Sequence, residues 1–210
     1  MAGGRLFVVA APSGAGKTSL VKALLQREPA LRVCVSHTTR PQRPNEVDGR
    51  DYHFVDRERF QQMVRDGAFL EHAPVFDHFY GTSLQALQEA FGAGFDVVLE
   101  IDWQGARQVR TKVPACVSIF ILPPSRGALE QRLRDRRTDS PEVIARRLSD
   151  AVTDMGHYRE FDCVVVNDDF ETAVEELRRI LAAARDSDAS AAGLGPARAD
   201  LGPLVAGLLG

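Results

Sequence analysis

Short apolar runs rich in β-branched residues recur along this chain, and polar stretches separate each run from the next. The runs span residues 6–10, 33–36, 95–101, 116–122 and 163–166. Most of them do not alternate between apolar and polar residues, a pattern typical of parallel strands that are covered on both faces. We therefore expect these runs to form the strands of a central parallel sheet.

Apolar residues at helical spacing fill most of the intervals between the runs. The predicted helices cover 20–26, 60–64, 84–91, 103–112, 129–137, a segment opened by Ser140 and Pro141, and 170–185. Asp56 and Ser83 stand directly before two of them, where side chains that cap helices are preferred. Because strand and helix alternate, the pattern predicts an α/β fold.

Residues 38–82 depart from this alternation. Short strand-like stretches at 52–55, 69–73 and 75–80 surround a single predicted helix, and prolines and glycines interrupt the segment. Such punctuation is typical of hairpins rather than of parallel strands with crossover helices. We expect an antiparallel insertion beside the main sheet.

The end of the chain consists mostly of Ala, Gly, Leu, Pro and Asp. This composition predicts a disordered tail over residues 187–210, and we interpret its apolar patch at 204–209 as a passive extension rather than a docking segment. Residues 1–186 then form one domain. We divide it into a core (1–37, 83–131 and 148–186), an insertion (38–82) and an arginine-rich lid (132–147).

Length and composition exclude several classes of protein. The chain has 210 residues, 44% hydrophobic and 26% charged, which fits a globular chain and excludes collagen-like, coiled-coil and wholly disordered classes. A formal net charge of −3 gives no general attraction to nucleic acid or to an anionic membrane. No apolar stretch reaches the roughly 18 residues of a membrane span. Three separated cysteines without metal-ligand spacing indicate buried thiols in a reducing cytoplasm.

The strongest motif follows the first apolar run directly. It comprises Ala11, Pro12, Ser13, Gly14, Ala15, Gly16, Lys17 and Thr18. Its glycines let backbone N–H groups converge on phosphate oxygens at a helix N-terminus. Lys17 would add a positive charge for the terminal phosphates, and the Thr18 hydroxyl a ligand for Mg²⁺. Although Ala11 replaces the first glycine of the usual pattern, the strand and helix on either side are intact, so the motif predicts a nucleotide-phosphate site.

Two carboxylates lie at the end of the run over 95–101. Glu100 or Asp102 could hold magnesium or its water shell, but a residue at position 102 could equally cap the helix that begins at Trp103. Residues 102–105 also match the DxxG element of GTP-hydrolysing switches. Because no NKxD sequence accompanies it to read guanine, we interpret this match as a coincidence.

Arginines concentrate in two further places. Arg40 and Arg43 lie on a proline-bounded turn before Tyr52, where they could clamp the phosphate of a second molecule or form a solvated basic turn. The other arginines are at 132, 134, 136, 137, 146 and 147, on two helical segments. A lid that carries arginines would supply the charge neutralisation and water exclusion that phosphoryl transfer needs. Two phosphate sites and a lid indicate a kinase for a small phosphorylated acceptor.

With these motifs the chain closely resembles the guanylate kinases. The matching segments run in order from about residue 6 to 170 and read APSGAGKTSL, SHTTRPQRPNEVDGRDYHFV, FLEHAPVFDHFYGTS, EIDWQGA, SIFILPPS, RLRDRRT and VVNDDF. The SHTTR and FYGTS segments are specific to guanylate kinases among P-loop proteins. The resemblance implies a three-layer P-loop fold, a mixed α/β insertion that binds GMP, and ATP-dependent conversion of GMP, and of dGMP, to the diphosphate in the cytoplasm.

The resemblance also implies a role for individual positions. The GMP site would comprise Ser36, Arg40, Arg43, Tyr52, Glu71, Tyr80, Thr82 and Asp102. The ATP site would comprise residues 11–18 together with Arg132 and Asn167. Lys17, Arg40, Arg136 and Arg147 would be catalytic, and Thr18 and Glu100 would hold Mg²⁺. Only ATP and GMP are implied as partners, without nucleic acid or membrane, and the oligomeric state stays open.

Some positions depart from the family pattern, and two other functions stay in view. Glu100 stands where the family usually has Asp, Arg137 where Gly is common, and Thr82 where Ser is frequent. A GTPase switch would share the phosphate loop but gives no reason for the arginine clamp. A non-catalytic interaction module would keep the GMP pocket and lose the loop, yet Lys17 and Thr18 are present.

Overall fold

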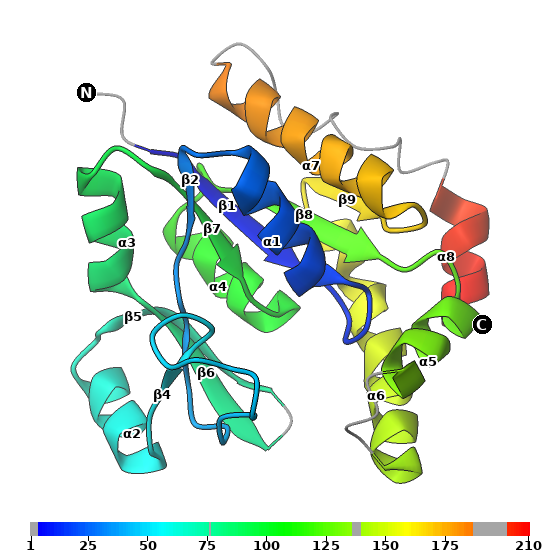
Figure 1. Cartoon of the computed structure of the whole chain (residues 1–210), viewed down its shortest axis with the longest axis horizontal. Helices are drawn as coiled ribbons and strands as arrows, with labels where there is room; N and C mark the ends of the chain where they lie inside the picture. Colours follow the sequence, from blue (N-terminus) through cyan, green and yellow to red (C-terminus); the bar gives the residue numbers. More distant parts are fainter. Residues whose placement is uncertain (1–3, 76, 136–139, 187–200) are drawn as a thin grey trace. The chain divides into compact units, whose positions relative to one another are not determined.

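The computed structural model describes residues 4–75, 77–135, 140–186 and 201–210 (Figure 1). The chain forms two compact units. The first unit comprises Met1–Val8 and Pro29–Cys116, and the second comprises Val9–Glu28 and Val117–Gly210. Strand β1 (Leu6–Ala10) contributes its first residues to the first unit and Val9 and Ala10 to the second.

The first unit contains the whole of the predicted insertion. Its elements are β2 (Leu31–Val33), β3 (His37–Thr38), β4 (His53–Phe54), α2 (Arg57–Arg65), β5 (Phe69–Val75), β6 (His78–Ser83), α3 (Leu84–Gly92), β7 (Asp96–Glu100) and α4 (Trp103–Lys112). The side chains of Asp56, Ser83 and Asp102 cap α2, α3 and α4 by accepting hydrogen bonds from backbone N–H groups of the first turn. The helix starts predicted after Asp56 and Ser83 are therefore confirmed.

Four strands of the first unit form a mixed sheet in the order β4-β3-β6-β5. The β3–β6 and β5–β6 pairs are antiparallel, as predicted for the insertion, whereas β3 and β4 run parallel. In the β5–β6 pair Glu71 lies opposite Thr82. Phe60 of α2 packs on Phe69 of β5 with ring centroids 4.8 Å apart, so the helix covers the sheet through aromatic contact.

The strand predicted over residues 33–36 is wrong. Val33 ends β2, which pairs in parallel with β7, and the chain enters the mixed sheet only at His37. The segment between them crosses from one sheet to the other inside the core, where Cys34 and Ser36 are buried. Burial made this crossing as apolar as a strand, and apolar character alone does not separate the two.

The second unit contains the end of β1 and the C-terminal half of the chain. Its elements are α1 (Lys17–Arg27), β8 (Val117–Leu122), α5 (Arg126–Asp135), α6 (Pro141–Met155), the 3₁₀ helix η1 (Gly156–Glu160), β9 (Cys163–Val166), α7 (Phe170–Arg185) and α8 (Gly202–Leu209). Strands β8 and β9 pair in parallel, and every residue of β8 is buried. The strand order of the larger sheet is β2-β7-β1-β8-β9, so the predicted α/β fold with a central parallel sheet is confirmed.

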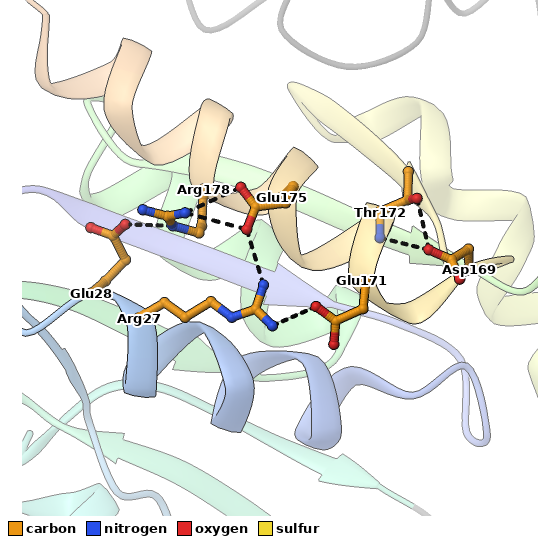
Figure 2. Close-up of polar contacts among 7 residues, drawn as sticks. All are labelled: Arg27, Glu28, Asp169, Glu171, Thr172, Glu175 and Arg178. Atoms are coloured by element: carbon orange, nitrogen blue, oxygen red, sulfur yellow. Dashed lines mark hydrogen bonds and ion pairs between the residues drawn. The ribbon is translucent and has the colours of Figure 1, made fainter.

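Charged side chains join helix α1 to helix α7 (Figure 2). The Arg27 guanidinium donates to Glu171 and, at 3.0 Å, to Glu175. Arg178 donates to Glu28 at 3.0 Å and also to Glu175, so the acidic and basic groups form a network rather than isolated pairs. Networks of this kind hold a helix in register more effectively than single exposed ion pairs. Helix α1, which begins at the phosphate loop, is thereby anchored along its C-terminal turn.

Helix α8 differs from the predicted disordered tail. It contacts α6, and Leu201, Val205 and Leu208 are buried. Because these side chains repeat at helical spacing, they form an apolar stripe that packing on α6 removes from water. The remainder of the predicted tail, residues 187–200, lies outside the described residues.

The cysteines agree with a further expectation. Cys34, Cys116 and Cys163 are all buried and form no disulfide. Burial raises the pKa of the Cys34 thiol to about 11, and the nearby Glu71 carboxylate adds to this rise. Within the described parts of the chain, no helix combines the length and apolar character needed to cross a bilayer.

Candidate active site

The phosphate loop of the second unit has the backbone geometry that its sequence predicted. Gly14 and Gly16 adopt positive φ values of 93° and 96°, which favour glycine because it has no Cβ. Gly16 is the N-cap of α1, and the first turn of this helix contains no acidic residue. Lys17 and Thr18 open the helix, so the N–H groups of its first turn, the lysine amine and the threonine hydroxyl belong to one short segment.

Asn167 and Arg132 hold the backbone of this loop. The Asn167 side chain donates to the carbonyl of Ala15 at 2.7 Å, and Arg132 donates to the carbonyl of Asn167 at 3.0 Å. A Cβ on Gly16 would lie 2.3 Å from Nδ2 of Asn167, so glycine is required here by contact as well as by φ. The structure thus brings together the loop and the two further residues that the resemblance assigned to the ATP site.

A pocket of about 300 Å³ opens beside the loop. Its lining residues are Gly14, Gly16, Ser19, Arg132, Asn167, Asp168 and Phe170. Sequence reasoning missed Ser19, Asp168 and Phe170, although the last two lie within three residues of Asn167 in the VVNDDF segment. Phe170 presents an exposed aromatic ring at the start of α7. The pocket therefore offers both polar groups and an aromatic face to a nucleotide.

The remaining predicted residues of this unit are placed as follows. Ala11, Pro12 and Ser13 lie in the loop between β1 and α1, and Arg147 lies in α6. Arg136 and Arg137 are outside the described residues. Arg134 pairs with Glu130 on an exposed helix face, so this member of the arginine cluster faces solvent.

A second group of predicted residues meets in the first unit around Glu71. The side chain of this residue is buried, with 2% of its surface exposed. Thr82 donates its hydroxyl to Oε1 of Glu71 at 2.6 Å, and the Ser36 hydroxyl lies 3.5 Å from that of Thr82. One buried carboxylate and two hydroxyl groups thus form a continuous polar chain.

Burial raises the pKa of the Glu71 carboxyl to about 7. The charge of Asp102 raises it as well, whereas the hydrogen bond from Thr82 and the charge of Lys112 act in the opposite direction. Because the pKa of this carboxyl lies close to neutral pH, any ligand that donates hydrogen bonds to it stabilises its ionised form.

The predicted phosphate clamp begins beside this polar chain on strand β6. Its residue Tyr80 is two positions from Thr82, so the two side chains share one face of the strand. The guanidinium carbon of Arg40 lies 5.4 Å from the ring centroid of Tyr52, and the rings of Tyr52 and Tyr80 meet edge to face at 5.8 Å. Burial raises the pKa of the Tyr52 phenol to about 12, so it stays protonated and able to donate.

Glu46 contacts both arginines of the predicted clamp, and its role there was not predicted from the sequence. It accepts from the Arg40 guanidinium at 2.7 Å and from the backbone N–H of Arg43 at 2.9 Å. The Arg43 guanidinium lies 3.8 Å from the same carboxylate. A carboxylate that engages both arginines shows that this turn gathers positive charge around an anion rather than spreading it into solvent. Arg40 and Arg43 are therefore joined through one carboxylate.

The two acidic residues after β7 have different surroundings. Asp102 caps α4 by accepting from the N–H of Gly105 at 2.8 Å, which is one of the two roles that the sequence left open. Glu100 ends β7 and is partly buried. Within the described residues, no three His, Cys, Asp or Glu side chains gather as a potential metal site.

Comparisons with known proteins agree on one family. The family model for guanylate kinase matches residues 3–184. The chain is 60% identical over 181 residues to a guanylate kinase of Methylococcus capsulatus, covering 86% of this chain and 89% of the relative. It is 54% identical over 187 residues to the guanylate kinase of Escherichia coli strain K12, covering 88% and 90%. The crystal structure of guanylate kinase from Anaplasma phagocytophilum is similar to it with a TM-score of 0.74 and 33% identity, covering 90% and 89% of the two chains.

Proposed function

Because the chain belongs to the guanylate kinase family, we propose that it transfers the γ-phosphoryl group of ATP directly to a phosphate oxygen of GMP. The enzyme is a guanylate kinase, and its reaction is the ATP-dependent conversion of GMP to GDP. We further propose that dGMP is accepted and that the transfer is in-line, without a covalent enzyme intermediate.

The observation that carries this proposal is the buried carboxylate of Glu71 beside the Thr82 and Ser36 hydroxyls. Guanine offers two neighbouring donors, N1–H and N2–H, that one carboxylate accepts together, and an O6 acceptor for a hydroxyl group. Adenine would instead turn its N1 acceptor toward the carboxylate and leave buried polar groups unpaired. The pocket chemistry therefore favours a guanine base.

The monophosphate would bind in the clamp of Arg40, Arg43, Tyr52 and Tyr80. Arginine forks match phosphate oxygens in pairs, and protonated phenols add neutral donors. Glu46, which engages both arginines, would release part of this contact to the incoming phosphate. Neither the base pocket nor the clamp requires a 2′-hydroxyl, which is why we include dGMP.

Phosphoryl transfer would need alignment and charge neutralisation rather than a general base. The phosphate of GMP is already an anion near neutral pH, so it needs no proton removed before attack. Lys17, Arg40, Arg136 and Arg147 would neutralise the charge that spreads over the transferred group. Arg132 and Asn167, at the rim of the phosphate-loop pocket, would contact the adenine end of ATP.

Magnesium fits the donor atoms that the chain provides. The Thr18 hydroxyl and the Glu100 carboxylate would hold the ion, because both offer the oxygen donors that Mg²⁺ prefers. When bound, the ion would neutralise phosphate charge on ATP. We also place the reaction in a reducing cytoplasm, a proposal supported by the three buried cysteines.

A coupled assay of ADP formation tests the proposal. We expect turnover with GMP and dGMP and at least about a hundredfold lower kcat/KM with AMP, CMP and UMP, because only guanine satisfies both oxygens of the Glu71 carboxylate. Release of inorganic phosphate from GTP in the absence of GMP would point to a GTPase instead. Binding of GMP without turnover would point to an interaction module.

A further inference from the structure

Strand β5 lies at the edge of the mixed sheet, and the side chains of helix α4 occupy its outer edge. An edge strand carries backbone N–H and C=O groups that need partners other than a neighbouring strand. The Gln108 amide meets both groups of one residue: its oxygen accepts from the N–H of His72 at 3.2 Å, and its nitrogen donates to the C=O of His72 at 2.7 Å. The Lys112 amine donates to the C=O of Leu70 at 2.5 Å.

These contacts fix the main chain on both sides of Glu71. Leu70 and His72 point their backbone groups toward α4, and Glu71 between them pairs with β6 opposite Thr82. The strand segment that carries the carboxylate is therefore held along both of its edges. A glutamine that bonds both the N–H and the C=O of one residue substitutes for a strand neighbour more closely than water would.

The same helix also contacts the carboxylate itself. A Cβ on Gly105 would lie 2.5 Å from Oε2 of Glu71 and 3.2 Å from its Cδ, so only glycine lets the carboxylate approach α4 this closely. Thr82 holds the other oxygen, Oε1. Gly105, Gln108 and Lys112 are spaced by three and four residues and thus lie on one face of α4.

We propose that this face of α4, formed by Gly105, Gln108 and Lys112, positions the Glu71 carboxylate and thereby sets the preference of the enzyme for a guanine base. The inference rests on the proposed role of Glu71 in base recognition. All three are positioning residues: Gln108 and Lys112 reach the main chain of β5, and Gly105 makes room for the carboxylate. The charge of Lys112 also favours the ionised form of Glu71.

Accepting two hydrogen bonds at once makes the base pocket sensitive to small displacements. A carboxylate can receive N1–H and N2–H together only while its plane follows the plane of the base, within about 0.5 Å and 10–20°. A shift of β5 away from α4 would move the carboxylate out of this plane and lengthen one of the two hydrogen bonds before the other. The loss should then be larger for a base with both donors than for a base with one.

Inosine monophosphate provides the test, because its base keeps the N1–H and O6 of guanine and lacks the 2-amino group. Gln108→Met removes both bonds to His72 without adding charge. We expect kcat/KM for GMP to fall about tenfold, the factor for the net loss of one good hydrogen bond, and the fall to arise from KM. The preference for GMP over inosine monophosphate should shrink at least about threefold, while KM for ATP stays within about twofold.

Lys112 provides a second, exposed site in case Gln108→Met does not fold. Lys112→Met loses the bond to Leu70, whereas Lys112→Arg retains a donor for it, so the methionine variant should lose preference and the arginine variant should keep it. Gly105→Ala should act more strongly than either, because its Cβ would displace Oε2 of Glu71. Thr111→Ala, on the exposed side of α4, is the matched control and should retain the preference of the parent enzyme.

Two outcomes would overturn the proposal. The first is an equal loss of kcat/KM with GMP and inosine monophosphate together with a lower Tm, which a purely structural role of α4 predicts. The second is an unchanged preference for GMP in folded Gln108→Met and Lys112→Met. Glu71→Gln separates this failure from failure of the proposed function. If Glu71→Gln keeps the preference, base recognition by Glu71 is wrong; if it alone loses the preference, only the positioning role of α4 is wrong.

Discussion

Replacing Glu71 with Gln should make the nucleotide-free enzyme more stable at alkaline pH while it weakens GMP binding. The carboxylate is 2% exposed, and its pKa rises from 4.5 to about 7, first because burial removes its hydration and then because Asp102 repels it. Thr82 and Lys112 offset part of this effect. Glutamine has nearly the same shape and carries no charge, so it removes the unfavourable ionisation without opening a cavity.

The expected size follows from linkage. A carboxyl whose pKa is raised in the folded state contributes stability that is fully present below pH 4.5 and lost as the pH rises through about 7. The shift corresponds to about 3 kcal/mol. The variant avoids this loss, so its advantage in the free energy of unfolding should be small near pH 4.5 and approach about 3 kcal/mol above pH 7. For a chain of this size that raises Tm by roughly 6–12 °C.

Binding should change in the opposite direction. Two hydrogen bonds to a charged group contribute about 3 kcal/mol or more, so the Kd of GMP should rise about a hundredfold or more at pH 8.5. Thermal unfolding from pH 5 to 8.5 and calorimetric titration with GMP measure both effects. Glu89→Gln, on the exposed face of α3, is the control and should melt close to the parent protein. A Glu71→Gln variant that is less stable than the parent at pH 8.5, or a Tm gap that does not grow with pH, would refute the reasoning.

Three further predictions concern the phosphate sites. Lys17→Met should lower kcat about a thousandfold with Tm nearly unchanged, and near-normal turnover in a coupled assay would contradict its role. Gly16→Ala should cost about 2–3 kcal/mol in urea unfolding and raise KM for ATP, because its Cβ collides with Asn167. Gly67→Ala, which shares a positive φ but has open space, should cost only about 1 kcal/mol, and equal costs would exclude the collision. Arg40→Lys should raise KM for GMP about tenfold or more in steady-state kinetics, because an ammonium cannot form the paired bonds of a guanidinium; an unchanged KM would remove Arg40 from the clamp.

The sequence predicted the helices and strands whose ends are set by neighbouring residues, such as a capping side chain. The bounds expected for β1, α4, β9 and α7 match the structure, since buried runs without alternation and capping side chains such as Asp102 specify them. Asp102 also shows the limit of such reasoning. A carboxylate at this position can cap α4 or contact the guanine base, and the local sequence does not distinguish the two roles.

The parts that sequence did not predict depend on contacts between distant segments. Glu46 was not distinguished from other surface acids until folding placed it against Arg40 and Arg43. Gln108 and Lys112 look like solvent-facing residues of α4, and only the edge of β5, some 40 residues earlier in the chain, gives them partners. Helix α8 was obscured by its glycines and proline, whose low helix propensity is outweighed by burial against α6.

The buried cysteines give this enzyme a native reporter of local opening in each half of its architecture. Cys34 belongs to the first unit and Cys163 to the second, and neither thiol can meet a reagent until its surroundings unfold transiently. A time course of alkylation, read by mass spectrometry on the unaltered protein, would then rank the two units by how often they open. Added GMP should slow labelling at Cys34 selectively, because Cys34 lies close enough to Glu71 for the charge of this carboxylate to raise the pKa of the thiol.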